Sequence, residues 1–288
     1  MADLILEHIK GNTYYIPLPT IVGVYIENGE AILIDSSNNK DSARKVLRLL
    51  EKNNLKVKMI INTHSNADHI GGNAYFKNNT DCKIATTKLE SFFTEYPLLE
   101  PAFLYGGYPN ELLRNKFLCA KPSKVDYIIK SEGKILDTEL EAVELPGHFF
   151  EMIGIRTPDN VLFLADSLMP QNIIEKYHLF FLYDIKAHLD TLEKLKTIEA
   201  DFYVPSHAKC MTDIKELIDI NINKIYEIAE NVRKIYNENE LLKETDILAK
   251  TDSVLEEICK IYSIKLDANQ TVLLGSTIKS YISYILSL

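Results

Sequence analysis

The chain has 288 residues, of which 46% are hydrophobic and 25% charged, and it carries a formal net charge of −9. Such a composition is typical of a globular protein with one large domain or with one domain and an extension. No apolar run reaches the ~18 residues of a membrane span, and the acidic balance disfavours nucleic acid, which basic surfaces attract.

The start of the chain and its cysteines favour a reducing compartment. Residues 1–7 carry neither a basic region nor a small-residue cleavage site, so we expect no secretory signal and a cytoplasmic protein. No close cysteine pair is present, which predicts free thiols. The four cysteines are Cys82, Cys119, Cys210 and Cys259.

The first elements predict layers of strand and helix. Apolar runs at 14–16, 22–26 and 31–35 read as strands, and Asn28-Gly29 between the last two is a hairpin signal. A helix is expected over 41–52 because its apolar residues share one face.

A dense group of metal-type side chains follows the next predicted strand, 57–62. Residues 63–72 read THSNADHIGG, which places His64, Asn66, Asp68 and His69 within six positions. Imidazole and carboxylate at this density suit a borderline cation such as zinc. The loop is expected to open into a helix over 70–78.

Residues 88–130 interrupt the alternation of strands and helices with an aromatic, proline-punctuated insertion. One interpretation is a lid or apolar wall over the active site. The other is a helical hairpin packed on the core or in a dimer contact. The sequence leaves both open.

Three further metal-type residues each follow a strand-like run in the second half. His148 comes after a Pro-Gly turn, Asp166 closes the run 161–165, and His207 follows the run 203–205. The segment 134–166 reads as strand-rich, and 190–199 as a helix with His188 on the surface nearby. Helices are predicted at 214–237, 240–263 and 271–287, from apolar residues at helical spacing.

These four elements in this order resemble the metallo-β-lactamase superfamily, whose signature is HxHxDH, with Asn66 in place of the second histidine. The resemblance covers roughly residues 3–212. It implies an α/β fold, the αββα sandwich, in residues 1–212, with 88–130 inserted. Residues 213–288 are then an α-helical extension for packing or dimerisation.

The resemblance also implies a site for two metal ions. The first position would take His64, Asn66 and His148, the second Asp68, His69 and His207, and Asp166 would bridge them. A hydroxide held between the metals would be the nucleophile, and Asp68 would orient it and pass a proton to the leaving group. Because an amide oxygen is a poorer zinc ligand than imidazole, we expect one or two zinc ions, with manganese or iron as alternatives at the first position.

The favoured function is hydrolysis of a small ester or thioester, as in glyoxalase II, by a cytoplasmic metallo-hydrolase. Substrate contacts are expected from Phe149, Tyr177 and His178. The alternatives are a phosphodiesterase or nuclease of the same fold, a lactonase or β-lactamase-type hydrolase, and a non-catalytic metal- or ligand-binding relative. A small-molecule substrate is the expected partner, with no nucleic acid or membrane and with a homodimer as one option. The sequence does not identify the acyl group or the metal.

Overall fold

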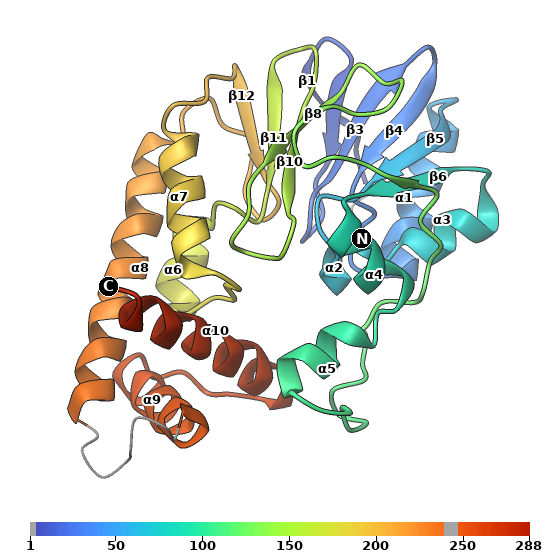
Figure 1. Cartoon of the computed structure of the whole chain (residues 1–288). Coiled ribbons are helices and arrows are strands. Elements are labelled where there is room, and N and C mark those ends of the chain that lie inside the picture. The colour runs from blue at the N-terminus through green and yellow to red at the C-terminus, as the bar shows by residue number, and fades with distance from the viewer. Residues whose placement is uncertain (1–3, 239–246) are drawn as a thin grey trace.

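Two β-sheets pack face to face between two layers of helices (Figure 1). This computed structural model describes residues 4–238 and 247–288. The seven-stranded sheet has the order β1 (Glu7–Lys10), β2 (Thr13–Ile16), β3 (Val22–Glu27), β4 (Glu30–Ile34), β5 (Lys56–Ile61), β6 (Lys83–Thr86) and β7 (Tyr127–Ile128). The five-stranded sheet has the order β12 (Phe202–Pro205), β11 (Val161–Ala165), β10 (Ile153–Arg156), β9 (Glu141–Glu144) and β8 (Gly133–Lys134).

The helices divide between the two outer faces and the C-terminal extension. They are α1 (Lys40–Lys52), α2 (Ala67–Ile70), α3 (Asn73–Asn79), α4 (Lys88–Glu95), α5 (Leu99–Tyr105), α6 (Gln171–Tyr177), α7 (Ile185–Leu195), α8 (Lys215–Glu238), α9 (Ile247–Ile261) and α10 (Ala268–Leu286). No helix in the described ranges is long and apolar enough to cross a membrane.

Side-chain alternation along β4 explains the layers on the first sheet. Ile32 and Ile34 point into the core between the sheets, where they join Phe163 of β11. Ala31 and Leu33 point the other way, into the core beneath α1. A strand that is apolar on both faces must be covered on both, and this produces the expected αββα sandwich.

The outer face of the second sheet shares one hydrophobic core with the extension. Leu162 and Leu164 of β11 belong to the same buried cluster as Ile218 of α8 and Ile278 of α10. The extension is therefore packed on the sandwich through an apolar interface. The domain boundary at residue 212 stays a prediction.

Most of the helices and strands predicted from the sequence are present. Their bounds differ where a helix cap or a close backbone contact ends or divides a helix. The 41–52 helix and the N-terminal strands are confirmed. The helix expected over 70–78 is instead two short helices, α2 and α3. They are separated by Gly71 and Gly72, whose added Cβ atoms would lie 2.6 Å from the oxygen of Asn38 and 2.1 Å from that of Ser36. The 190–199 helix begins earlier, at Ile185, and ends at Leu195.

The C-terminal helices agree with expectation within the described residues. The first covers Lys215–Glu238 and the last Ala268–Leu286. Of the helix expected over 240–263, Ile247–Ile261 is present, and 240–246 lies outside the described residues. The four cysteines are free thiols, as expected.

The insertion forms the helices α4 and α5, and an irregular segment then leads back to the first sheet at β7. α5 lies beside α10 (Figure 1). Buried Leu104 of α5 forms a small core with Leu113 and Leu118, against which Val272 and Leu273 of α10 pack. The insertion is thus packed on the extension, and its role as a lid or apolar wall stays a prediction.

One buried amide couples the extension to the loop that follows Asp166. Asn221 of α8 is fully buried. Its Oδ1 accepts a hydrogen bond from the Met169 amide at 3.0 Å, and its Nδ2 donates to the Met169 carbonyl at 2.9 Å. If the buried amide and carbonyl of Met169 lost the Asn221 side chain, no hydrogen bond would offset the free energy of removing them from water.

We therefore expect Asn221→Ala to lower the free energy of unfolding by about 2–4 kcal/mol, since two buried backbone groups lose their partners. Urea denaturation followed by circular dichroism measures it. The matched control is Asn223→Ala, an exposed position of the same helix. Equal midpoints for the two variants would contradict the coupling.

Candidate metal centre

The Asp35 carboxylate, at the end of β4, holds the motif loop after β5. Its Oδ1 accepts the Thr63 amide at 2.9 Å, and its Oδ2 accepts the Thr63 hydroxyl at 2.7 Å. Oδ2 also lies 2.8 Å from Nδ1 of His69. Both oxygens of one buried side chain thus fix the backbone and a histidine of the loop.

Asp35 also sets the tautomers of two histidines. The Thr63 hydroxyl donates its hydrogen bond to Asp35, so the hydroxyl oxygen accepts from Nδ1 of His64 at 3.1 Å. Nδ1 of His69 donates directly to Asp35. Both rings therefore carry a proton on Nδ1 and direct Nε2 toward the centre of the site, which is how a carboxylate behind a histidine prepares it to bind a metal.

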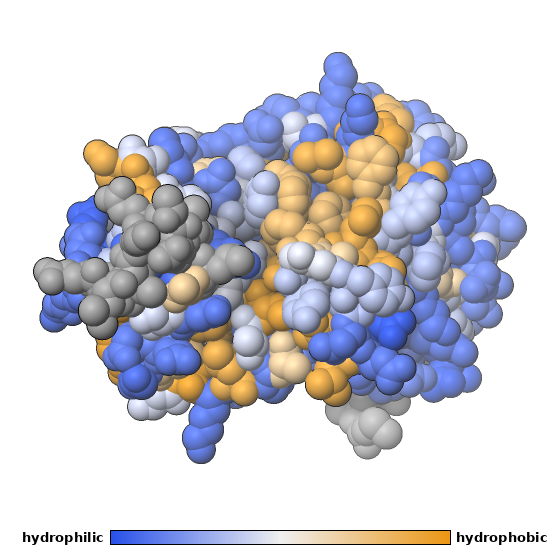
Figure 2. All heavy atoms as spheres, turned by 60° about the horizontal axis from the view of Figure 1, so that its bottom comes forward, coloured by the Kyte–Doolittle hydropathy of each residue, from blue (hydrophilic) through white to orange (hydrophobic). Residues whose placement is uncertain are grey.

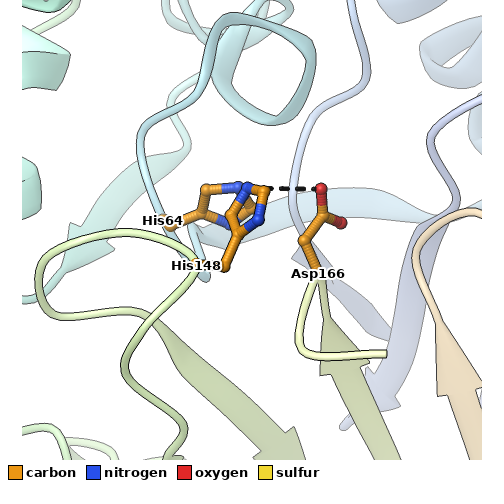
Figure 3. Close-up of side chains that lie close together, drawn as sticks. All are labelled: His64, His148 and Asp166. Atoms are coloured by element: carbon orange, nitrogen blue, oxygen red, sulfur yellow. Dashed lines mark ion pairs between the residues drawn. The ribbon is translucent and has the colours of Figure 1, made fainter. Parts of the chain in front are cut away.

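The first group of converging side chains is His64, His148 and Asp166, whose ligand atoms lie within 4.8 Å of one another (Figure 3). His148 follows Gly147, which has φ +117° and lies so close to α7 that an added Cβ would be 2.2 Å from the His188 amide nitrogen. Nε2 of His148 lies 3.6 Å from Oδ2 of Asp166. Only glycine fits this turn, so the Pro-Gly pair places the histidine.

The second group is Asp68, His69 and His207, whose ligand atoms also lie within 4.8 Å of one another. Oδ2 of Asp68 accepts from the Thr20 hydroxyl at 2.8 Å. Nδ1 of His207 bonds the Pro19 carbonyl at 2.9 Å, which leaves Nε2 3.2 Å from Oδ2 of Asp166. Asp166 therefore lies between the two groups.

The electrostatics of the cluster depend on its buried carboxylates. Burial lowers the pKa of His64 and His148, so both rings are neutral. Against the effect of burial, Asp166 and Asp68 raise the pKa of His207 to about 9 and hold that of His69 well above its usual range. Negative charge at the centre thus attracts protons, as it would a metal cation.

The donor set fits a divalent metal. Nε2 of His64 and Nε2 of His69 are buried and have no hydrogen-bond partner among the residues that the structure describes, and neither has Oδ1 of Asp166. Buried polar atoms without partners are rare, and a bound ion is one of the accepted explanations. Four imidazoles with two carboxylates match the preference of zinc and similar cations.

Asn66 lies within this cluster, as the sequence predicts. Its Oδ1 is 3.1 Å from Nε2 of His148, and its Nδ2 donates to Oε1 of Glu100 at 2.7 Å. The structure therefore brings together all seven predicted residues: His64, Asn66, Asp68, His69, His148, Asp166 and His207. Their roles as ligands, and that of Asp68 in catalysis, stay predictions.

Two buried glutamates of the insertion were not predicted from the sequence. Glu100 contacts Asn66, and burial raises its pKa well above the usual range. Glu90 is fully buried and accepts from the Ser65 amide and hydroxyl and from the Glu151 amide. Glu100 is the single carboxylate of the apolar segment Leu99–Tyr105, where burial without a partner is costly, whereas α4 also carries Lys88 and Glu95 and gives no such signal for Glu90.

The three expected substrate contacts lie in different surroundings. Phe149 is fully buried, 5.1 Å from the ring of Phe93. His178 stacks on Tyr262 of the extension, while Lys176 lies over the ring of Tyr177. Phe149 also lies beside the metal-type cluster, since its ring centroid is 6.3 Å from that of His64. The role of the three residues in substrate binding stays a prediction.

The expectation that His188 lies on the surface was wrong. It is buried in α7, behind the Gly147 turn. Burial lowers its pKa to about 3, so the ring is neutral. Its apolar neighbours in the helix, not its own polarity, decide its position.

A cavity of about 400 Å³ opens beside Asp68. Its walls come from the motif loop, the insertion and the start of α10, and its lining residues are Asn38, Asn39, Asp68, Lys116, Phe117, Asp267, Asn269, Gln270 and Leu273. Figure 2 shows the face of the molecule where α5 and α10 lie, with apolar residues in a band across its middle. The size suits a small molecule with both apolar and polar parts.

Residues 16–207 match the model of the metallo-β-lactamase superfamily, which is most of the chain. The chain therefore belongs to this superfamily of metal-dependent hydrolases.

Among characterised relatives, it is 25% identical over 193 residues to hydroxyacylglutathione hydrolase of Haemophilus ducreyi, with 66% of each chain covered. It is 26% identical over 147 residues to hydroxyacylglutathione hydrolase 1 of Vibrio vulnificus, which covers 51% of this chain and 47% of the relative. The matches thus span two thirds or less of these enzymes.

Solved structures show the same fold at low sequence identity. A metallo-β-lactamase from Pontibacter korlensis has a TM-score of 0.60 at 16% identity and covers 77% of this chain and 99% of its own. A β-lactamase domain protein from Burkholderia ambifaria has a TM-score of 0.68 at 14% identity and covers 98% of this chain and 88% of its own. The second similarity includes the helical extension.

The Asp35→Asn variant tests whether Asp35 sets the tautomers of the two histidines for metal binding. The new amide would present a donor to Nδ1 of His69, so the ring proton would move to Nε2. We expect metal affinity to fall by about 10–100-fold, the usual cost of losing a second-shell partner. Competition with a chromophoric chelator measures it.

The control for this variant is Asp41→Asn, an exposed position in the first turn of α1. Its metal affinity should equal that of the wild type. If Asp35→Asn also binds metal as tightly as the wild type, Asp35 does not set the tautomers.

Proposed function

We propose that this protein hydrolyses a small ester or thioester with the help of one or two divalent metal ions held by the seven clustered residues. The observation that carries the proposal is the pair of buried Nε2 atoms of His64 and His69, which make no hydrogen bond within the described residues. Nε2 of His69 lies 3.3 Å from the Asp166 carboxylate. A cation bound there would supply an activated water and stabilise negative charge on the substrate. Zinc is the proposed metal, with manganese or iron as alternatives.

Asp68 is the proposed catalytic acid–base residue. It is partly exposed, it lines the cavity, and the Thr20 hydroxyl fixes its carboxylate. A carboxylate held at the border between the cluster and the cavity can accept a proton from water and return it to a leaving group. The other ligands are more buried and do not line this cavity.

The cavity supports a small substrate in preference to a nucleic acid. Lys116 is the only cationic side chain in its described lining, and Asp68 and Asp267 oppose it. A polyanion requires several basic contacts, and the chain as a whole carries a charge of −9. The relatives that act on acylglutathione, a thioester, support the ester or thioester class. The cytoplasmic location and the homodimer stay predictions.

A substrate panel tests the proposal. Metal-loaded protein is assayed with a thioester, an aryl ester, a homoserine lactone, nitrocefin and a phosphodiester. We expect turnover of the thioester or ester, abolished by a chelator and restored by metal. Preferred turnover of the lactone, nitrocefin or phosphodiester would instead assign one of the alternative hydrolase classes. No turnover in the panel at full metal loading would favour a non-catalytic relative.

For Asp68→Asn we expect kcat to fall by about 10²–10⁴-fold, the usual effect of removing a general acid–base group. The metal content of each preparation is measured by elemental analysis, so that a lost proton donor is distinguished from a lost ligand. The control is Asp81→Asn, at an exposed position outside the site. Unchanged kcat in Asp68→Asn would remove this residue from the mechanism.

A further inference from the structure

The insertion places one buried side chain, Glu100, against Asn66 at the edge of the metal-type cluster. Glu100 is in the first turn of α5 and is only 4% exposed. Its Oε1 accepts a hydrogen bond from Nδ2 of Asn66 at 2.7 Å. The position at which this chain departs from HxHxDH is therefore the position that Glu100 contacts.

This hydrogen bond determines which atom of Asn66 faces the cluster. Nδ2 is directed to Glu100, and Oδ1 consequently points to the other side, 3.1 Å from Nε2 of His148. Oε1 accepts here, as an oxygen of an ionised carboxylate does and as the carbonyl oxygen of a neutral carboxyl group does, so the opposite rotamer of the amide would place two acceptors together. Glu100 thus selects the orientation in which Asn66 offers an oxygen lone pair.

Glu100 acts through Asn66 and is not itself in the cluster. Within the described residues, its carboxylate belongs to neither group of ligand atoms that lie within 4.8 Å of one another. Oδ1 of Asn66 and Nε2 of His148 lie beside each other, and Nε2 also faces Asp166 at 3.6 Å. An ion among His64, His148 and Asp166 would meet the amide oxygen at the place of the missing imidazole.

We propose that Glu100 is a positioning residue that makes Asn66 an oxygen ligand, so that the two residues together replace the second histidine of the motif. The first metal position then consists of His64, His148, Asp166 and the Asn66 oxygen. With fewer nitrogen ligands than an all-histidine position, it favours manganese or iron relative to zinc.

The C-terminal extension secures this arrangement. Leu104, one turn after Glu100, is buried against Val272 and Leu273 of α10. Phe103 contacts Phe150, which follows the ligand His148 by two residues, with ring centroids 5.4 Å apart. The helix that carries Glu100 is therefore fixed from both sides.

Four full-length variants test the proposal by metal binding and not by activity. They are Glu100→Ala, Glu100→Gln, Asn66→His with Glu100→Ala, and the control Glu111→Ala, an exposed glutamate of the same insertion. Each apoprotein is titrated with Zn²⁺, Mn²⁺ and Co²⁺. Stoichiometry is read by elemental analysis, affinity by chelator competition, and the ligand field by the Co²⁺ absorption spectrum.

The wild type is expected to bind two metals. Glu100→Ala should weaken one position by about 10–100-fold, as for other lost second-shell partners, and leave the other unchanged. Glu100→Gln should retain binding, because its amide oxygen can accept from Asn66. Asn66→His should restore the weakened position in the Glu100→Ala background, since imidazole needs no acceptor, and should shift its preference toward zinc.

The inference rests on the metal centre of the proposed function, and the titration distinguishes the two failures. A wild type that binds no metal overturns both. A wild type with two metals and a Glu100→Ala variant with the same affinities overturns the inference alone, as does a wild type that binds one metal. If Asn66→His did not restore metal binding in the Glu100→Ala background, Glu100→Ala would damage the fold. Glu100 would then not be a positioning residue.

Discussion

The hydrogen bonds of one buried carboxylate, Asp35, determine how the rest of the site is organised. The carboxyl end of β4 lies beside that of β5, so one side chain can hold the loop that follows the neighbouring strand. Asp35 has φ +62°, a left-handed conformation that aspartate tolerates better than most residues. The sharp turn lets the side chain reach the Thr63 amide and the His69 ring. The histidines are thereby oriented by the sheet before any ligand is bound.

Much of the fold and most of the site could be predicted from the sequence because their signals are local. Alternating apolar residues define the strands, and the strands place His64, His148, Asp166 and His207 at their ends. The contact between Glu100 and Asn66 joins positions 34 residues apart through an irregular insertion. Helical periodicity describes α5 but does not show which distant residue Glu100 contacts. A buried carboxylate is recognised only when its partner is known, and the partner is a product of tertiary packing.

The difference between local signals and tertiary contacts also explains why the burial of His188 and the division of the helix after the motif were not predicted. His188 was expected on the surface because histidine is polar, yet the apolar face of α7 buries it. A continuous helix was expected over 70–78, but the break at Gly71 and Gly72 depends on where the backbone of Ser36 and Asn38 passes. In each case, a neighbour from a distant part of the chain overrides the local preference.

The packing of α10 against α5 has a consequence for the order in which the molecule is assembled. α10 follows the sandwich in the sequence, and its first turns provide both the partner of Leu104 and one wall of the cavity beside Asp68. Proteins are synthesised from the N-terminus, so the sandwich and its histidines can form while the final helix is still being made. The cavity acquires its last wall only after α10 has been synthesised. The newly made chain can therefore pass through a stage in which the predicted ligand residues are in place but the cavity beside Asp68 is incomplete.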